Sequence, residues 1–388
     1  MTRLTRRNFL KTSALSASGA LFLQPALPKP PLPMGSDGPP PIRRKLGRTG
    51  LVLPIVSFGV MRSDNPGLVR AALKAGMTHL DTAHGYMRGN NEEMLGRVLQ
   101  GLSRESFVIA TKIQPERKDD ILAKLDLSLR RLRLEYVDIL YLHGVTSRET
   151  VLSAELIDTL KEAKASGKVH FVGLSTHKNE PDVIQAAADG GFYDVVLTAF
   201  NFRQDHQDDV RKAIANAYKA GMGIVAMKTM AGAFFDKDRK EPINCRAALK
   251  WVLQDEHVTT SIPGITSFDH LTENLSVASD ITLTDQEKGD LRLGQMQGGL
   301  YCNGCSRCVG TCKRSLPIPE MMRAYMYAYG YGSAQMAKDL LTREGTDLCA
   351  GCSTCTASCV KGFAIRERMN DIARLRSLPE EFLSGDFA

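Results

Sequence analysis

The stretch MTHLDTAHGY, residues 77–86, decides the fold. Its apolar beginning predicts a short strand that ends at Asp81, and the loop after this strand carries Tyr86. In a (β/α)8 barrel the carboxyl ends of all strands meet on one face, and that face holds the chemistry. The stretch therefore predicts one strand of such a barrel, with two polar side chains on its reactive face.

Two later segments repeat this arrangement. Residues 107–111, FVIAT, run into Lys112, and residues 137–142, VDILYL, run into His143. Because parallel strands of a barrel end on the same face, we expect Lys112 and His143 to converge with the two polar residues of the first stretch.

These four residues, in this order, closely resemble the Asp, Tyr, Lys, His tetrad of the aldo-keto reductase superfamily, through the motifs LDTAHGY, IATK and LYLHG. The resemblance implies a (β/α)8 TIM barrel, NAD(P)H as the cofactor and a small-molecule carbonyl or alcohol substrate. It implies that Asp81, Tyr86, Lys112 and His143 are catalytic. Each residue alone could instead be a helix cap, a packed aromatic, a solvated lysine or a core histidine. Their joint occurrence in this order favours catalysis.

Carbonyl reduction gives these residue types a physical logic. A proton must reach the developing alkoxide, and a phenol with a pKa of about 10 is a weak donor at neutral pH. We expect the Lys112 ammonium to lower the pKa of Tyr86, because it favours the charged form. Asp81 would hold Lys112 charged and in place. His143 would orient the carbonyl oxygen and share in the proton transfer.

Length and patterning agree with a barrel over residues 42–293. The chain has 388 residues and a hydrophobic content of 43%, whereas such a barrel needs about 250 residues. Residues 42–53 predict a β-hairpin that resembles the one closing the barrel bottom in this superfamily, and residues 55–60 predict the first strand. Further apolar runs lie near residues 77, 107, 136, 169, 193, 222 and 259. Amphipathic stretches between them predict βαβ units and a parallel sheet.

The resemblance also assigns a cofactor site. The residues it implies are Ser175, Phe200, Asn201, Lys228, Gly264, His270, Glu273 and Asn274. Ser175 matches the serine that contacts the nicotinamide carboxamide, Phe200 replaces a stacking tyrosine, and Lys228 lies in the phosphate-side loop. The helix after Gly264 suits phosphate at its N-terminus. Because His270 stands where the family has its 2′-phosphate arginine, NADH and NADPH both stay open.

The C-terminal segment, residues 294–388, predicts a small, mainly helical ferredoxin-like domain. Eight of the nine cysteines form two C-x2-C-x2-C-x3-C runs, namely Cys302, Cys305, Cys308 and Cys312, then Cys349, Cys352, Cys355 and Cys359. This spacing is typical of two [4Fe–4S] clusters, in which the fourth cysteine of each run serves the other cluster. Zinc and disulfides are the alternatives. Residues 319–341 predict a helix whose Met and Tyr side chains pack around the clusters, and Cys245 predicts a buried thiol at a helix start.

The N-terminal arm, residues 1–41, contains the twin-arginine pattern TRRNFLK, a short apolar run and a proline-rich spacer. It predicts export by the Tat machinery, with the protein periplasmic or membrane-associated through an uncleaved signal. The alternative is an unfolded basic tail. The net charge of +7 is modest, and no basic face interleaved with aromatics is evident, so we expect no nucleic-acid binding.

Two functions fit these parts. The first is an exported NAD(P)H-dependent oxidoreductase with an iron–sulfur electron-transfer module. The second is an electron-transfer protein that exchanges electrons with a redox partner protein. In this case the barrel of the present chain is a non-catalytic or flavin-binding partner surface. Nicotinamide carries two electrons as hydride and a cluster carries one, so their direct exchange is chemically awkward. A purely structural role for the clusters is a third alternative.

Overall fold

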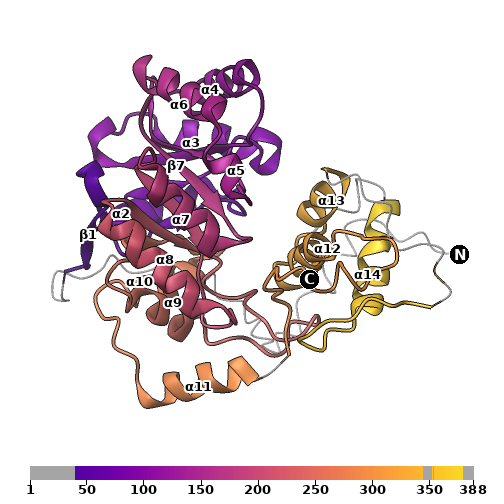
Figure 1. The fold of residues 1–388 in the computed structure, drawn as a ribbon. Helices are drawn as coiled ribbons and strands as arrows, with labels where there is room; N and C mark the ends of the chain where they lie inside the picture. Colours follow the sequence, from indigo (N-terminus) through magenta and orange to yellow (C-terminus); the bar gives the residue numbers. More distant parts are fainter. Residues whose placement is uncertain (1–39, 297, 344–351, 353, 379–388) are drawn as a thin grey trace, which may run out of the picture.

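The computed structural model describes residues 40–296, 298–343, 352 and 354–378. Figure 1 shows a barrel surrounded by helices and a smaller helical module beside it. Helix α11 (Asp285–Met296) leads from the barrel to the module, so the predicted boundary at residue 293 falls inside this helix. The predicted twin-arginine signal lies outside the described residues.

Eight parallel strands form one sheet, and their order in the sheet is their order in the chain. They are β3 (Phe58–Gly59), β4 (His79–Asp81), β5 (Val108–Ile113), β6 (Val137–Leu142), β7 (Val169–Thr176), β8 (Val195–Ala199), β9 (Gly223–Met227) and β10 (Thr260–Ser261). Parallel bridges from Val56 to Ser261 and from Gly59 to Gly264 join the two edges. The predicted eight-stranded barrel is confirmed.

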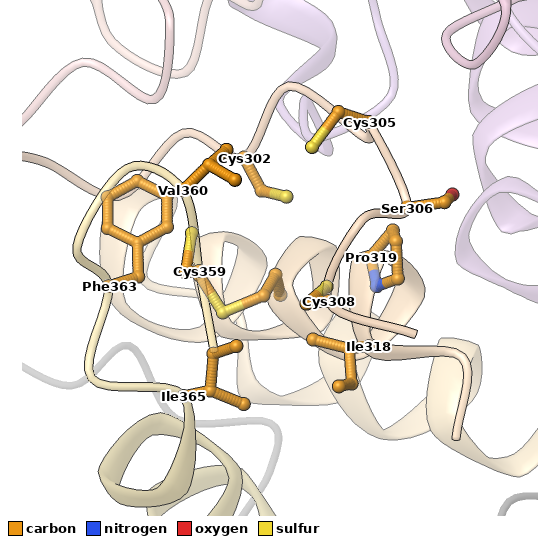
Figure 2. Close-up of a pocket in the computed structure, with 11 residues that line it drawn as sticks. Cys302, Cys305, Ser306, Cys308, Ile318, Pro319, Cys359, Val360, Phe363 and Ile365 are labelled. Atoms are coloured by element: carbon orange, nitrogen blue, oxygen red, sulfur yellow. The ribbon is translucent and has the colours of Figure 1, made fainter. Parts of the chain in front are cut away.

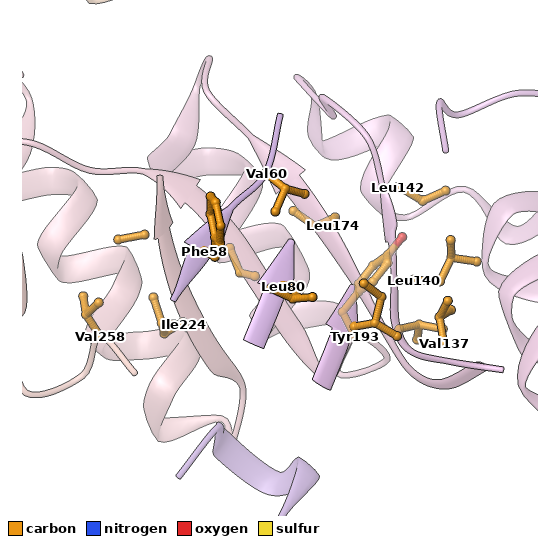
Figure 3. Close-up of a cluster of buried hydrophobic side chains, with 14 of the residues drawn as sticks. Phe58, Val60, Leu80, Val137, Leu140, Leu142, Leu174, Tyr193, Ile224 and Val258 are labelled. Carbon is orange, nitrogen blue, oxygen red and sulfur yellow. The ribbon is translucent and has the colours of Figure 1, made fainter. Parts of the chain in front are cut away.

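Helices cover the outside of this barrel. They are α2 (Pro66–Lys74), α3 (Asn90–Leu99), α4 (Lys118–Leu132), α5 (Arg148–Val151), α6 (Ala154–Ala165), α7 (Glu180–Gly190), α8 (Gln207–Lys219), α9 (Cys245–Leu253) and α10 (Phe268–Leu275). Helix α2 shows the local logic: the Asn65 side chain accepts a hydrogen bond from the Gly67 amide at 2.9 Å, and Pro66 needs no donor at the first position. Figure 3 shows part of the apolar layer around the strands, including Leu140 and Tyr193.

A hairpin closes the barrel bottom, as predicted. Strands β1 (Arg43–Lys45) and β2 (Val52–Pro54) pair antiparallel. Leu46 and Leu53 are fully buried against the barrel interior. Gly47 has a φ of +49°, and a Cβ there would lie 2.3 Å from the Gly223 amide nitrogen, so only glycine allows this approach.

The module is mainly helical, as predicted. Helix α12 (Ile318–Tyr325) continues into a π-helical turn, η4 (Met326–Gly330), and is followed by α13 (Ala334–Arg343), α14 (Ile365–Ala373) and the short η5 (Arg374–Ser377). The helix expected over residues 319–341 is therefore interrupted near Tyr331. In the part of the chain described, no helix is long and apolar enough to span a bilayer.

Barrel and module share a hydrophobic core. From the barrel, Phe202, Ile243 and Ala247 contribute to this shared core, and Leu300 and Met326 contribute from the module. The backbones also approach closely, because a Cβ on Gly330 would lie 2.9 Å from the Gly232 carbonyl oxygen. The module therefore packs directly against the rim of the barrel and is not an independent domain on a linker.

Candidate functional site

Asp81 and Lys112 form a buried ion pair at the carboxyl ends of neighbouring strands. Asp81 ends β4, and Lys112 lies in β5, which pairs with β4. The Lys112 ammonium donates to the Asp81 carboxylate and to the Thr82 carbonyl oxygen, the latter at 2.6 Å. Both side chains are 2% exposed or less. Burial raises the pKa of Asp81 and lowers that of Lys112, and the charge of each partner opposes this shift.

Tyr86 and His143 complete the predicted constellation. Tyr86 begins the short helical turn η2 (Tyr86–Gly89), and its ring centroid lies 4.9 Å from Lys112 Nζ. The Tyr86 and His143 rings meet edge to face, with centroids 5.8 Å apart. The structure thus brings all four predicted catalytic side chains together at the barrel mouth.

The expected lowering of the pKa of Tyr86 is wrong for the protein alone. Burial raises the pKa of Tyr86 well above its ordinary value, and the Asp81 carboxylate raises it further. Burial removes water from the phenolate and so disfavours the charged form, and the carboxylate adds to this effect. Tyr86 therefore keeps its proton at neutral pH.

Two polar side chains inside the barrel escaped the sequence analysis. His79 and Tyr141 are fully buried, and neither their side chains nor Asp81 Oδ2 have a hydrogen-bond partner among the described residues. Burial, aided by Lys112, lowers the pKa of His79 to about 3. Each residue lies two positions before a tetrad member, and alternation along a strand puts such pairs on one face. That spacing was the signal that could have identified them.

Ser175 and Asn201 lie at strand ends and are buried. Ser175 Oγ accepts a hydrogen bond from the Gly144 amide at 2.9 Å, next to His143. Asn201 Nδ2 donates to the Lys228 carbonyl oxygen at 3.2 Å. In the protein alone both side chains tie neighbouring strand ends together, and any contact with a cofactor would add to these bonds.

Phe200 does not fit the predicted stacking role. Its ring is fully buried on the outside of the barrel, 5.0 Å from the Trp251 ring and 5.3 Å from the Arg211 guanidinium. Leu197, three positions earlier, points into the barrel. Side chains alternate along a strand, so an odd offset puts Phe200 on the opposite face.

The predicted nucleotide end lies around helix α10, which begins after Gly264. Ser267 caps this helix by accepting from the His270 amide at 3.2 Å. The His270 ring lies 3.1 Å from Thr266 Oγ1, and its pKa is lowered mainly by burial, with smaller effects from Arg62 and Arg239. Two arginines therefore stand near the position where the family has one.

The other two residues of this end differ in burial. Asn274 is buried, and its Oδ1 atom has no hydrogen-bond partner among the described residues, while Glu273 is exposed. Gly264, which follows β10, has free space on its side-chain face, because a Cβ there would meet nothing within 4 Å.

Four cysteines of the module surround one cavity. Figure 2 shows Cys302, Cys305, Cys308 and Cys359 facing the same space, which is partly open to solvent. This set joins the first three cysteines of one run to the last of the other, as predicted for one cluster. Among the described residues no three His, Cys, Asp or Glu side chains gather tightly enough for a single metal ion. Thiols spread around a cavity suit a multi-iron cluster better than one zinc ion.

The second predicted cluster is only partly within the described residues. Cys312, Cys352 and Cys355 are described and are free of disulfides, as are the cysteines of the first cavity. Cys349 lies outside the described residues. Cys245 begins helix α9 as predicted, and burial raises the pKa of its thiol to about 12.

A second cavity lies between barrel and module, and we call it the interdomain cavity. Its barrel wall includes His177 and Lys228, and its module wall includes Cys302, Glu320 and Arg323. The Arg323 guanidinium lies 2.9 Å from the His177 ring nitrogens. Burial, with a smaller effect from Arg323, lowers the pKa of Lys228 to about 7. Cys302 lines this cavity and the cysteine cavity alike.

Two tyrosines of the module approach the tetrad, although the sequence suggested that they pack around the clusters. The Tyr327 and Tyr331 rings stack with centroids 5.5 Å apart. Both residues contribute to the raised pKa of Tyr86, after burial and Asp81. Lys228 Nζ lies 5.9 Å from the Tyr327 ring. The turn η4 is therefore part of the barrel mouth.

Comparisons with known proteins match both halves of the chain. Residues 59–247 match the model of the Aldo/keto reductase family, and residues 301–364 match a 4Fe-4S dicluster domain. "Probable aldo-keto reductase 1" of Glycine max is 24% identical over 324 residues, covering 67% of this chain and 92% of its own length. L-galactose dehydrogenase of Arabidopsis thaliana is 33% identical over 152 residues, covering 34% of this chain and 47% of its own.

Solved structures share the fold. The aldo-keto reductase AKR11C1 from Bacillus halodurans, in its holo form, superposes with a TM-score of 0.56 at 22% identity, covering 66% of this chain and 96% of its own. The aldo-keto reductase from Klebsiella pneumoniae, solved in complex with NADPH, gives a TM-score of 0.54 at 22% identity, with the same coverage. These structures show the fold, while the family models and the curated relatives support an oxidoreductase of the aldo/keto reductase type with a 4Fe-4S dicluster domain.

Proposed function

From an Aldo/keto reductase domain joined to a 4Fe-4S dicluster domain, we propose that this oxidoreductase interconverts a small-molecule carbonyl and its alcohol with NAD(P)H. The observation that carries the proposal is the convergence of Asp81, Lys112, Tyr86 and His143 at the barrel mouth. When bound, the nicotinamide supplies the hydride.

The side chains divide the remaining work. Tyr86 donates its proton to the carbonyl oxygen, and its raised pKa keeps it protonated until the reaction begins. The Lys112 ammonium, 4.9 Å from the ring centroid, stabilises the phenolate that forms. Asp81 and the Thr82 carbonyl hold that ammonium in place. His143, at the edge of the Tyr86 ring, orients the carbonyl.

The residues of the cysteine cavity fit an iron–sulfur cluster. In the proposal, Cys302, Cys305, Cys308 and Cys359 bind one [4Fe–4S] cluster, and Cys349, Cys352, Cys355 and Cys312 bind a second. Burial raises the pKa of Cys302 to about 11. A bound metal group would favour its thiolate, because coordination requires the deprotonated form. The clusters would carry electrons to or from a redox partner protein.

A second candidate is favoured by one observation, the position of Cys302 in the walls of both cavities. In this case the chain is primarily an electron-transfer protein, and the barrel mouth holds a flavin or a non-reacting ligand beside the cluster. Mass spectrometry of molecules released from anaerobically purified protein separates the candidates. A bound flavin supports the second, and a bound nicotinamide dinucleotide supports the first.

The Tat signal completes the proposal, because the twin-arginine pattern in residues 1–41 predicts export of the folded, cofactor-loaded protein. Replacing both arginines, Arg6 and Arg7, with lysine should keep the protein in the cytoplasmic fraction. Export of this variant at the wild-type level would contradict the assignment.

Tyr86→Phe tests the catalytic part. Loss of the proton donor should lower carbonyl reduction by about 100-fold or more, while the affinity for the dinucleotide stays unchanged. Tyr218→Phe is the matched control, because Tyr218 is exposed on the outside of the barrel. Equal activity of Tyr86→Phe and the wild-type protein would exclude this mechanism.

A further inference from the structure

The interdomain cavity is rich in positive charge. Lys178, Lys228 and Arg323 bring three basic side chains to its wall, and Glu320 is the one carboxylate among its lining residues, so positive charge is in excess. Glu320 forms an ion pair with Arg323. Among the described residues, the Lys228 ammonium has no hydrogen-bond or ion-pair partner. Burying a charged ammonium without an ionic or hydrogen-bonding partner costs free energy. An anionic ligand that pairs with the ammonium would offset this cost.

His177 in the wall of this cavity, and Tyr327 beside its Lys228, lie near the catalytic tetrad. The His177 ring stands beside the residue that follows His143, since a Cβ on Gly144 would be 4.0 Å from His177 Nε2. Tyr327 lies next to Lys228 and contributes to the electrostatic environment of Tyr86. A molecule whose carbonyl lies between Tyr86 and His143 can therefore extend toward the excess of positive charge.

We propose that the interdomain cavity binds the carboxylate of the substrate, so that the substrate class is an oxo acid and Arg323 and Lys228 are the anion-binding residues. This inference rests on the proposed carbonyl chemistry. Arg323 is well suited to the role, because a guanidinium offers a planar fork of donors to a carboxylate. As Arg323 belongs to helix α12, the module completes the substrate site of the barrel.

Matched pairs of carbonyl compounds test this assignment with full-length, cluster-loaded protein under anaerobic conditions. The pairs are succinic semialdehyde with butanal, and phenylglyoxylate with its methyl ester. In the wild-type protein, the charged member of each pair should have a kcat/KM about 10- to 100-fold higher, as expected for a charged hydrogen bond. Arg323→Gln should bring this ratio close to about one, and Arg323→Lys should retain part of it.

Two further variants make the test specific. Lys237→Gln removes another ion pair between barrel and module, to Asp371 of helix α14, and should leave the ratio at the wild-type value. If Arg323→Gln fails to load its clusters, Lys228→Gln repeats the test from the barrel wall. A lowered ratio in Lys237→Gln would mean that general docking, and not the cavity, sets the preference, and would overturn the proposal.

Direct binding separates this inference from the proposed function. Phenylglyoxylate binding is measured by calorimetry with and without NADP+. One outcome is that the acid binds to the wild-type protein but not to Arg323→Gln, and that no carbonyl is reduced. This result would support the anion site and contradict the reductase function. If carbonyls are reduced without preference for the acid, the anion site falls and the function stands.

Two other results would give Arg323 and Lys228 a different role. Weaker binding of NADP+ to both variants, with binding of the acid unchanged, would make them contacts of the dinucleotide phosphates. A changed electron paramagnetic resonance signal of the cluster, with binding of the acid unchanged, would make them partners of the cluster near Cys302. Either result overturns the proposal.

Discussion

Arg62, which follows strand β3, reaches across the barrel mouth to Tyr331 of the module. Its guanidinium donates a hydrogen bond to the Tyr331 carbonyl and lies 5.0 Å from the centroid of the Tyr331 ring. The two residues are 269 positions apart in the chain. Arg62 thus links the barrel to the residue that directly follows the π-helical turn η4.

Arg62→Ala should loosen this contact. Losing a charged hydrogen bond and a cation–π contact should weaken docking of the module by about 1–3 kcal/mol. Hydrogen exchange should then increase in residues 326–331 and in the facing loop at residues 230–233, while the strands keep their protection. Arg70→Ala, at an exposed position of helix α2, is the control and should change neither region.

Asp81→Asn should destabilise the barrel by about 3–5 kcal/mol, because it leaves the Lys112 ammonium buried without its counter-charge. Unfolding in urea can be followed by fluorescence of Trp251, the single tryptophan of the chain. The double variant Asp81→Asn with Lys112→Met should recover part of this loss. Simple addition of the two single effects would show that the pair does not act as a unit.

His79 should make stability depend on pH. Its pKa is about 3 in the folded barrel and about 6.5 when unfolded, so the unfolded chain binds more protons below the higher value. The free energy of unfolding should therefore fall as the pH decreases from about 6.5, and at about pH 5 this residue should account for a loss of roughly 2 kcal/mol.

His79→Leu should remove this part of the pH dependence, and the exposed His170→Leu should keep it. Urea unfolding of the three proteins at about pH 7 and about pH 5 provides the comparison. Parallel losses in the wild-type protein and His79→Leu would assign the effect to other groups.

The proposed pair of [4Fe–4S] clusters with crossed ligand sets can be tested by single replacements. Cys359→Ala should disturb the cluster of Cys302, and Cys312→Ala should disturb the other, because each fourth cysteine is predicted to serve the distant run. Each variant should retain about four of about eight iron atoms per chain. Spectra of the surviving cluster should differ between the variants, and identical spectra would contradict the crossed arrangement.

The sequence predicted the tetrad because its signal is local. Asp81, Lys112 and His143 each lie at or near the end of an apolar strand, and the geometry of a parallel barrel brings strand ends together without further information. The hairpin at the barrel bottom and the helical character of the module followed from similarly local patterns. The same alternation rule, applied to Leu197 and Phe200, could have prevented the wrong stacking assignment.

Contacts between the halves could not be predicted in this way. The interdomain cavity depends on how helix α12 and the turn η4 meet the loops after β7 and β9, and no spacing in the sequence encodes that meeting. In the sequence, nothing distinguishes Arg323 and Tyr327 from other residues of a helical segment. Only the structure shows that Arg323 contacts His177 and that Tyr327 lies beside Lys228.

The shared core has a consequence for synthesis of the chain. Phe202, Ile243 and Ala247 leave the ribosome well before Leu300 and Met326, which cover them in the finished fold. During that interval the rim of the nascent barrel presents an uncovered apolar patch, the kind of surface that chaperones bind and that promotes aggregation. Because the module is organised around its cysteine cavity, iron supply would limit how soon that patch is covered. Iron starvation should then reduce the yield of soluble barrel as well as the number of clusters.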